Sequence, residues 1–557
     1  MKRILNKSIS VCICLLMMPM ICSAQDIQNV KPVKNIILMI PDGCSLATVS
    51  TARWYQWMKY PEMEKLTIDP YLCGTVRTTC SNAPIGDSAP TTSAYMTGYN
   101  SMAGWVATYP TSSGKDDIYP VDPQKAYQPL ATVMEASRLL KNKSTGLVCT
   151  CIFSHATPAD CSSHSYNRNR YDVLASQQAH NGINVVLGGG AKYMSSDMEE
   201  YLKGHGVSIF QNDLEGARKC ENNNMWSLFT TDAMSHDLDR DATKEPSLAE
   251  MTEIAIKKLS ADKDGFILMV EGSQVDDCAH CNDPIGMVTE FLAFDKACKV
   301  ALDFAKKNGE TAVVILPDHG NSGISIGKKE LVGYSRIPSR QIFGPLLNYK
   351  ATCDGMRTKL NNAPFEDAEK IFKEWCDITL SEKEMNALKN NPNYVSSPIP
   401  RAERQHDKNY DRDLAKMIGQ FMTARTGLAY TTWGHTGEDV FLAAYHPEAE
   451  SRPRGMLTNI ELNHYLCNLA GFTHDDLDKL TADIFVPHTE VFKDMQCEIA
   501  DNTLTVIYNG NKAIIKPNTN VVTINGKDEE LKSVVIYVDK NNKYYLPRSL
   551  RSRMGAK

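Results

Sequence analysis

The chain contains 557 residues, of which 42% are hydrophobic and 23% are charged, and its formal net charge at pH 7 is −6. This composition is ordinary for a globular protein, and the length allows one large α/β domain with insertions, or two or three domains. No stripe of basic residues is present, so the charge gives no reason to expect a nucleic-acid partner.

The first two dozen residues differ from the rest and predict a secretory signal peptide over 1–24. Basic residues precede an apolar run over 11–22, and small residues follow it. The run is too short for a stable membrane span, and no later stretch reaches that length. We therefore expect an exported protein, periplasmic or secreted, without a transmembrane segment. Lipid attachment at Cys22 is the alternative, and the bulky Ile21 argues against it.

Short, nearly continuous apolar runs predict buried strands along most of the chain. These runs lie at 33–40, 145–153, 183–187, 265–270, 311–316 and 439–445. In a parallel sheet, ligands bind beyond the carboxyl ends of the strands. Residues that can carry chemistry follow these predicted ends: Asp42, His155, Thr157, Glu271, Asp318 and His319.

Helical patterns alternate with these runs. Over 286–307, apolar residues recur at steps of three and four. The alternation predicts an α/β fold with a mostly parallel central sheet and helices on both of its faces. Another helix is expected to begin at Ser88 and to end at Gly98. Its first turn would direct free backbone N–H groups toward an anion, although such a serine can also be a helix cap alone.

Two stretches interrupt the alternation. About 327–430 is rich in proline, asparagine and charged residues, with helices expected at 365–375 and 411–425, and it predicts an insertion that forms a lid or an interface. From about 494, alternating apolar runs separated by Asn-Gly turns predict a small β appendage over 494–557. The α/β domain is then expected over 25–493.

The cysteines do not assign a disulfide framework. Of the 17 cysteines, those after the predicted signal peptide are even in number, which permits disulfides without pairing them. Cys149 and Cys151 alternate within a predicted strand, so core packing is the favoured interpretation. Cys278 and Cys281 flank His280 in the segment described next.

The most specific segment is 271–280, directly after a predicted buried strand. Glu271, Asp276 and His280 lie at offsets of zero, five and nine. Because a buried carboxylate without a partner is costly, this density of ligands predicts a cation. Other candidate ligands are Asp318, His319 and His435. Carboxylates with histidines suit zinc, whereas the all-oxygen set of Asp42, Thr157 and Glu271 suits magnesium.

In their order along the chain, these motifs resemble those of the alkaline phosphatase family, from about 36 to 445. The matching motifs are Pro-Asp42-Gly, Asp87-Ser88-Ala, His155-Ala-Thr157-Pro, Arg168, Glu271 with Asp276 and His280, Asp318-His319, and His435-Thr-Gly-Glu. The resemblance implies hydrolysis of small-molecule phosphate monoesters through a phosphoserine, with two zinc ions and one magnesium ion. Family members are commonly homodimers, which implies the same for this chain.

The resemblance also implies a role for each matching residue. Ser88 would be the nucleophile, and Arg168 would clamp the phosphate. Asp276, His280 and His435 would hold the first zinc ion, and Asp42, Asp318 and His319 the second. Asp42, Thr157 and Glu271 would hold magnesium, which His155 would contact through water. Arg170 could replace Arg168, but the family's spacing after His155 favours Arg168.

Two residues depart from the family pattern. Asp277 stands where relatives often carry lysine or histidine, which removes a positive charge near the phosphate and leaves the occupant of the third site open. Pro317 precedes Asp318 where small residues are usual. Cys278 and Cys281 are not expected to bind metal, because carboxylates and histidines already complete both zinc sets.

Three alternatives remain. A sulfatase requires an arginine four positions after the nucleophile, where this chain has Thr92. A phosphodiesterase is disfavoured by Glu271, which completes a third metal site. A phosphate-binding protein without catalysis is disfavoured by the complete set of ligands.

Overall fold

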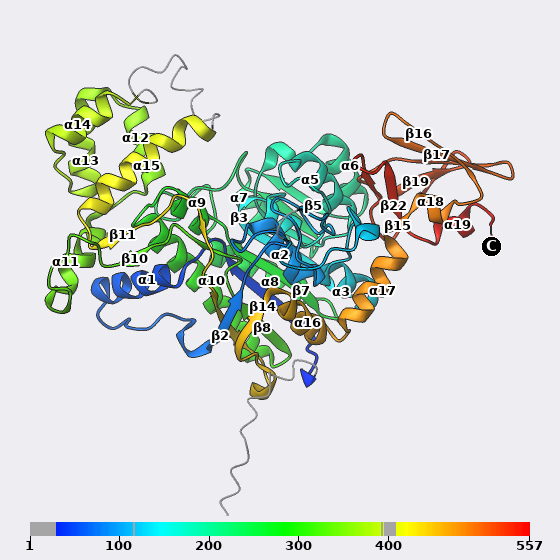
Figure 1. Cartoon of the computed structure of the whole chain (residues 1–557), viewed down its shortest axis with the longest axis horizontal. Coiled ribbons are helices and arrows are strands. Elements are labelled where there is room, and N and C mark those ends of the chain that lie inside the picture. The colour runs from blue at the N-terminus through cyan, green and yellow to red at the C-terminus, as the bar shows by residue number, and fades with distance from the viewer. Residues whose placement is uncertain (1–28, 115–116, 392–393, 395–407, 557) are drawn as a thin grey trace, which may run out of the picture.

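The computed structural model describes residues 29–114, 117–391, 394 and 408–556, and of the side chains at 408–411 nothing is described. The predicted signal peptide lies outside these residues, as does part of the predicted insertion. The chain forms a central α/β body with a group of helices at one end and a small β unit at the other (Figure 1).

A 10-stranded sheet forms the centre of the body. In spatial order its strands are β14 (Gly455–Thr458), β2 (Leu72–Arg77), β13 (Val440–Tyr445), β8 (Thr311–Ile315), β1 (Asn35–Pro41), β7 (Phe266–Gly272), β3 (Ser144–Ile152), β4 (Val185–Gly189), β6 (Met225–Leu228) and β5 (Ser208–Gln211). β13 runs antiparallel to both of its neighbours, and the other neighbouring pairs are parallel. The mostly parallel sheet predicted from the apolar runs is confirmed.

All six predicted strands are present, each within a few residues of its expected bounds. Four further strands of the sheet, β2, β5, β6 and β14, were not expected from the sequence. They have four to six residues each, and such short runs give little local signal. Their pairing with neighbouring strands, rather than their own pattern, makes them part of the sheet.

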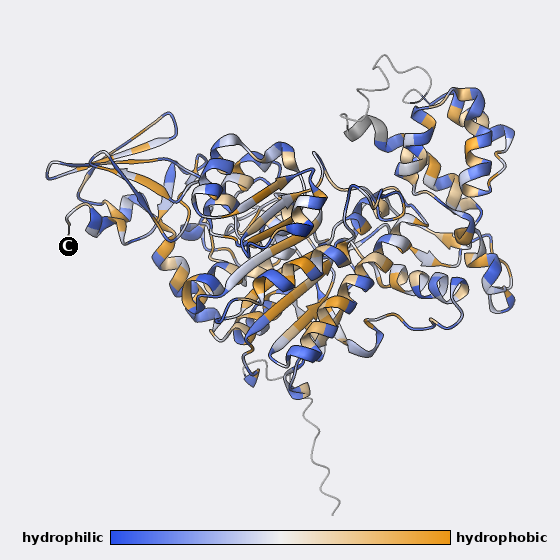
Figure 2. Ribbon diagram, turned by 180° about the vertical axis from the view of Figure 1, so that it is seen from behind, coloured by the Kyte–Doolittle hydropathy of each residue, from blue (hydrophilic) through white to orange (hydrophobic). Residues whose placement is uncertain are grey.

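Helices cover both faces of the sheet, and β1 shows why. Ile37 and Met39 point into one hydrophobic cluster, whereas Ile36, Leu38 and Ile40 point into another. α1 (Leu46–Lys59), α8 (Leu248–Leu259) and α10 (Gly286–Asn308) pack into the first cluster, and α2 (Ser88–Thr97), α3 (Val133–Lys141), α16 (Asn459–Ala470) and α17 (His474–Ile484) into the second. Figure 2 shows hydrophobic strands at the centre of the body, with helices beside them that carry both hydrophobic and hydrophilic residues.

The predicted insertion leaves and re-enters the body through one pair of strands. β10 (Ser325–Ile326) pairs antiparallel with β11 (Leu428–Ala429). The described helices between them are α11 (Ser339–Phe343), α12 (Cys353–Asn361), α13 (Ala368–Cys376), α14 (Glu382–Lys389) and α15 (Lys408–Ala424). α13 and α15 correspond to the two helices expected from the sequence.

The C-terminal part is a β unit with a hydrophobic cluster of its own, between Val486 and Met554, and it also packs on the body, since Val534, Ile536 and Val538 belong to the second cluster of the central sheet. One sheet is an antiparallel meander of β16 (Gln496–Ala500), β17 (Thr503–Tyr508), β18 (Asn511–Ile515), β19 (Val521–Ile524) and β20 (Lys527–Glu530), and the other joins β15 (Val486–Pro487), β22 (Lys543–Leu546) and β21 (Ile536–Val538). The Asn509-Gly510 and Asn525-Gly526 turns have positive φ at both residues, as Asn-Gly hairpins require.

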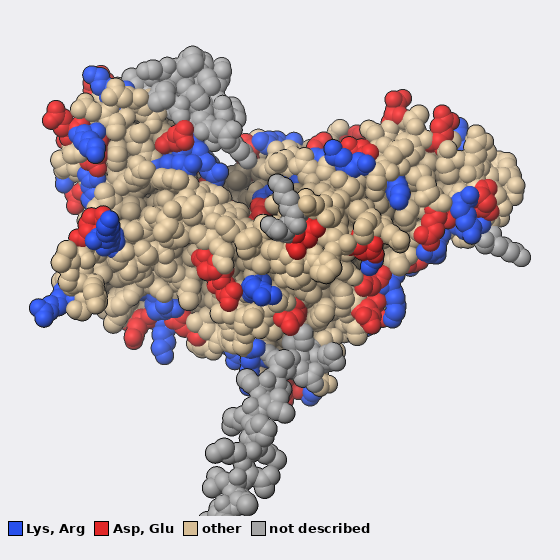
Figure 3. Space-filling view, viewed as in Figure 1, with Lys and Arg blue, Asp and Glu red and all other residues tan. Residues whose placement is uncertain are grey.

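The structure also shows how the surface charges are distributed and whether the cysteines form disulfides. On the face shown in Figure 3, basic and acidic side chains are interspersed. The cysteines that the structure describes are all free thiols, and most of them are buried. Within the described ranges, no helix is both long enough and apolar enough to cross a membrane.

Candidate metal centre

Residues from distant parts of the sequence converge at the carboxyl edge of the sheet. Asp42 follows β1, Ser88 begins α2, and Glu271 ends β7 beside Gly272. His155 and Thr157 lie at α4 (Ala156–Ala159) after β3, Asp276 and His280 lie on α9 (Gln274–His280) after β7, and Asp318 and His319 follow β8. The rule that ligands gather at the ends of parallel strands explains this convergence.

His435 reaches the same place by a different route. It lies on β12 (His435–Thr436), which pairs antiparallel with β9 (Gly320–Asn321) directly after His319. The imidazole rings of His319 and His435 are stacked with their centroids 3.7 Å apart. A two-residue pairing therefore joins His435 to the segment directly after His319.

Ser88 lies at the start of α2 and beside one group of candidate ligands. Its N-cap is Asp87, and the helix ends at Gly98 with a φ of 79°. Ser88 Oγ is 3.2 Å from His319 Nε2 and 3.5 Å from Asp42 Oδ1. His319 Nε2 is in turn 3.4 Å from both Asp42 Oδ1 and Asp318 Oδ2. The predicted position of Ser88 at a helix start is confirmed.

Asp276, His280 and His435 form a second group, closer to solvent. His280 Nε2 is 3.3 Å from Asp276 Oδ2, and His435 Nε2 is 3.7 Å from Asp276 Oδ1. The side chains of these three residues are 15–21% exposed, whereas those of Asp318 and His319 are fully buried. Asn321 supports the group, since its Nδ2 donates a 2.6 Å hydrogen bond to Asp276 Oδ1.

Backbone carbonyls orient three of the candidate histidines in the same way. The Nδ1 atoms of His280, His319 and His435 lie 2.8–3.1 Å from the carbonyl oxygens of Trp433, Gly320 and Gly86. A carbonyl oxygen can only accept, so each Nδ1 carries the proton and each Nε2 of a neutral ring presents a lone pair. Yet Nε2 of His280 is 3.2 Å from Nε2 of His435. Two facing lone pairs beside a carboxylate fit a shared cation, and nitrogen with carboxylate oxygen suits zinc.

A third group brings Asp42 and Glu271 together with His155. Glu271 is fully buried, and its Oε1 makes no hydrogen bond within the described part of the chain. The buried hydroxyl of Thr157, on the neighbouring α4, also has no hydrogen-bond partner there. Unsatisfied oxygens of this kind fit a hard cation such as magnesium, which takes oxygen ligands.

The electrostatics of the edge are strongly perturbed. Burial, followed by the neighbouring carboxylate of Asp318, raises the pKa of Asp42 well above its usual value. Burial also raises the pKa of Glu271. Burial would raise the pKa of Asp276 as well, but His280 and the other imidazoles lower it well below its usual value. Burial and His319 lower the pKa of His435 to about 4. Such divergent shifts are typical of functional sites.

Arg168 lies at the same edge, held by Asp87, a residue of the Asp87-Ser88-Ala motif to which the sequence assigned no role. Its Nη1 donates a 2.5 Å hydrogen bond to Asp87 Oδ1, and its Nη2 is 3.2 Å from His155 Nε2. Asp87 also accepts from the backbone N–H of Gly104 at 2.8 Å. Arg170 instead lies over the Tyr166 ring. Of the two arginines considered, Arg168 is the one beside Ser88's own neighbour, Asp87.

Two basic side chains face Asp277, which departs from the family pattern. His236 Nε2 is 3.5 Å from one carboxylate oxygen, and Arg412 Nη2, on α15 of the insertion, is 3.2 Å from the other. Burial would raise the pKa of Asp277, but His236 and Arg412 lower it. Two distant elements thus offset the negative charge of Asp277. No local motif marks His236 or Arg412.

Comparison with known proteins identifies similar chains. The family model described as alkaline phosphatase matches residues 33–472. Alkaline phosphatase 3 of Bacillus subtilis (strain 168) is 33% identical over 448 residues, covering 78% of this chain and 88% of that protein. The structure of Thermus thermophilus alkaline phosphatase covers 84% of this chain and 99% of its own, with a TM-score of 0.67 and 20% identity.

A mutant of the alkaline phosphatase from the Antarctic bacterium TAB5, with Mg bound in its M3 site, is also similar in fold. It covers 80% of this chain and 99% of its own, with a TM-score of 0.53 and 21% identity. At these identities the two structures show a shared fold.

Proposed function

The chain belongs to the alkaline phosphatase family of metal-dependent phosphomonoester hydrolases, and we propose that it acts through a phosphoserine formed on Ser88, with two zinc ions and one magnesium ion. The observation that carries the proposal is the place of Ser88 Oγ, at a helix start and 3.2 Å from His319 Nε2. The N-cap of this helix is Asp87 and not Ser88, so capping does not explain the candidate metal ligands around the Ser88 oxygen.

Three ligand sets are proposed, as the resemblance implies, and the distances between their atoms support the two zinc sets. Asp276, His280 and His435 would hold one zinc ion, and Asp42, Asp318 and His319 the other. Asp42, Thr157 and Glu271 would hold magnesium, with His155 acting through water. The Mg held in the M3 site of the TAB5 mutant supports this third assignment by analogy alone.

In the proposed reaction, the Ser88 hydroxyl loses its proton to solvent and its Oγ attacks the phosphorus atom of the monoester. The bond from phosphorus to the leaving oxygen breaks, and the leaving group departs with the electron pair as an alcohol or phenol after it gains a proton. Water then cleaves the Ser88 phosphoester and releases inorganic phosphate. Divalent ions bound at these ligands would lower the pKa of the attacking hydroxyl and would stabilise negative charge on the attacking and leaving oxygens.

The remaining work is done by groups of the chain itself. Backbone N–H groups of the first turn of α2 point toward the phosphoryl oxygens. The guanidinium of Arg168 can bind two of these oxygens in a bidentate way. Asp87 orients Arg168 through the hydrogen bond from Nη1, and the N–H of Gly104 fixes Asp87. Asp87 is thus proposed as a positioning residue for the phosphate clamp.

The organisation of the whole protein is proposed on the same basis. Residues 1–24 would be a signal peptide that directs export to the periplasm or the medium, 25–493 the catalytic domain with its insertion at about 327–430, and 494–557 the β appendage. Signal cleavage predicts a mature N-terminus near residue 25, which N-terminal sequencing would check. A homodimer is expected from the family, and a monomeric mass in light scattering would contradict it.

The proposed function predicts selectivity among model substrates. The mature protein, loaded with zinc and magnesium, should hydrolyse p-nitrophenyl phosphate far faster than bis-p-nitrophenyl phosphate or p-nitrophenyl sulfate. The third ligand set disfavours the diester. Thr92 disfavours the sulfate ester, because a sulfatase requires arginine at that position. Initial rates of p-nitrophenol release under identical conditions would measure this.

The control for this comparison is the same protein after dialysis against chelator, which should turn over none of the three substrates. A higher kcat/KM for the diester or the sulfate ester would overturn the monoesterase assignment and favour the corresponding alternative.

A further inference from the structure

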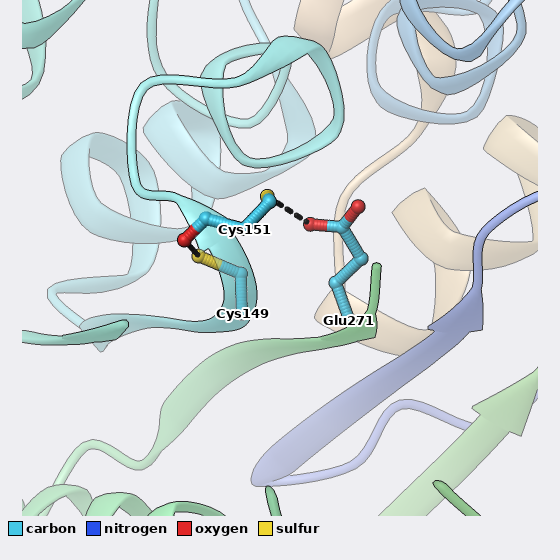
Figure 4. A group of neighbouring side chains, drawn as sticks. All are labelled: Cys149, Cys151 and Glu271. Carbon is cyan, nitrogen blue, oxygen red and sulfur yellow. Dashed lines mark hydrogen bonds between the residues drawn. The ribbon is translucent and has the colours of Figure 1, made fainter. Parts of the chain in front are cut away.

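Two cysteines and a glutamate lie together at the carboxyl edge of the sheet (Figure 4). Cys149 and Cys151 lie near the end of β3, and Glu271 lies at the end of β7; all three are buried. One ligand atom of each residue lies within 4.8 Å of those of the other two. The proposed hydrolysis uses Glu271 but gives neither cysteine a role.

The pairing of β3 with β7 places the two cysteines beside Glu271. In the parallel register of β3 and β7, Cys149 lies opposite Glu271. Both cysteines belong to the same hydrophobic cluster, as alternating residues of one strand do. On β4, a glycine makes room for them: a Cβ at Gly188 would lie 2.8 Å from Cys149 Sγ. The core packing predicted for the two cysteines is therefore present, but it places them against a carboxylate.

The polar contacts within the group are few. Cys151 Sγ is 3.4 Å from Glu271 Oε2, and Cys149 Sγ is 3.6 Å from the carbonyl oxygen of Cys151 (Figure 4). The hydroxyl oxygen of Ser273 accepts from the backbone N–H groups of Thr150 and Cys151, each at 3.2 Å, and is held beside them. A thiol is a weak donor, so it compensates little of the cost of a buried carboxylate.

We propose that Cys149, Cys151 and Glu271 form a binding site for a thiophilic divalent cation of the zinc class, in addition to the three ions of the proposed reaction. Two sulfurs and one carboxylate oxygen select zinc or cobalt over magnesium, because soft ligands favour the softer ion. Each thiol would release its proton to solvent as its bond to the ion forms. Three protein ligands leave a fourth position, near the Ser273 hydroxyl, for water.

The cysteine site would also affect the proposed magnesium site, because the two sites share Glu271. Glu271 presents Oε2 to the cysteines, whereas Oε1 makes no hydrogen bond within the described residues. Oε1 of Glu271 thus remains available as a ligand for the magnesium ion proposed between Glu271 and Asp42. A cation bound beside Cys151 would therefore fix the orientation of the Glu271 carboxylate for the proposed magnesium site.

Cobalt substitution tests the proposal independently of catalysis. The mature protein, without its predicted signal peptide, is freed of metal and reconstituted with Co²⁺. Its near-ultraviolet absorption and its content of bound cobalt are then measured. Sulfur-to-cobalt charge transfer absorbs there strongly, whereas imidazole and carboxylate ligands give no such band. We expect the band in the unmodified protein, and we expect its loss together with one cobalt ion per chain in the Cys149→Ser/Cys151→Ser variant.

The matched control is Cys298→Ser, which removes a buried thiol of α10 outside the group and should leave both readouts unchanged. If the double variant does not fold, as judged by circular dichroism, Cys151→Ser alone replaces it and must lose most of the band. Absence of the band in the unmodified protein, its survival in the cysteine variants, or a Cys149–Cys151 disulfide found by peptide mapping would overturn the site.

Phosphatase activity, measured on the same samples, keeps the two proposals apart. Full activity without the thiolate band would overturn this site and leave the proposed function standing. A thiolate band in a protein that is inactive with every ion would overturn the proposed function and support this site.

Discussion

Ser88→Ala should lower kcat for p-nitrophenyl phosphate by more than about 10⁴-fold, because the attacking oxygen is lost while the rest of the site remains. Ser88 is only 2% exposed, and its Oγ lies 3.2 Å from His319 Nε2. Removal of this one oxygen creates a small space and leaves every candidate ligand in place. Binding of inorganic phosphate, measured by calorimetry, should therefore be retained.

A direct search for the covalent intermediate completes this test. Acid quenching of the unmodified enzyme during turnover should leave a phosphoryl group on the peptide that contains Ser88, detected by mass spectrometry. Ser93→Ala is the matched control, since Ser93 lies on the same helix but donates its hydroxyl to Asp160 Oδ1, 2.5 Å away. That variant should stay within about tenfold of the unmodified rate. Turnover by Ser88→Ala near the control's rate would contradict the phosphoserine.

Removal of the metal ions should abolish activity and also destabilise the folded protein. The edge of the sheet holds buried carboxylates on Asp42, Glu271 and Asp318, which a cation compensates. A ligand present at about 1,000 times its Kd stabilises the native state by about 4 kcal/mol. We therefore expect EDTA to lower the thermal midpoint by several degrees, and zinc with magnesium together to restore both the midpoint and the activity.

Ser88→Ala serves as the control for this effect. It should show the same fall in thermal midpoint on chelation, although it is inactive, because its ligands are intact. An unmodified protein whose midpoint and activity both resist chelation would contradict the proposed metal sites.

The stability of the metal-free protein should also depend on pH. The pKa values of Asp42 and Glu271 are raised in the folded state, so the folded state binds more protons than the unfolded state above about pH 4. Their contribution to stability is therefore lost as the pH rises toward each raised value. His435 acts in the opposite direction, but only between its folded value of about 4 and its usual value of 6.5.

Thermal scans at successive pH values would detect this. From about pH 4 upward, the midpoint of the chelated protein should fall with rising pH relative to that of the metal-loaded protein, because the two carboxyl groups with raised pKa values outweigh the one histidine. Parallel pH profiles for the two forms would contradict a role for Asp42 and Glu271 as ligands.

The sequence by itself determined the α/β body and most of the candidate site. Strands such as 33–40 are marked by local apolar runs, and the start of α2 at Ser88 is marked by the residues on either side. Parallel strands end at one edge, so polar residues that follow different strands, such as Asp42 and Asp318, can be expected to meet there. The family motifs then supplied an interpretation of each residue.

Only the tertiary structure decided which partners complete that edge. The antiparallel direction of β13, the approach of His435 through its pairing with Asn321, and the contact of Arg412 with Asp277 all depend on segments far apart in the chain. The same holds for Cys151, which alternation placed in the core without indicating that its thiol contacts the carboxylate of Glu271. Periodicity and turn residues report each segment's own conformation, whereas register and side-chain contacts between segments are set by how the whole chain packs.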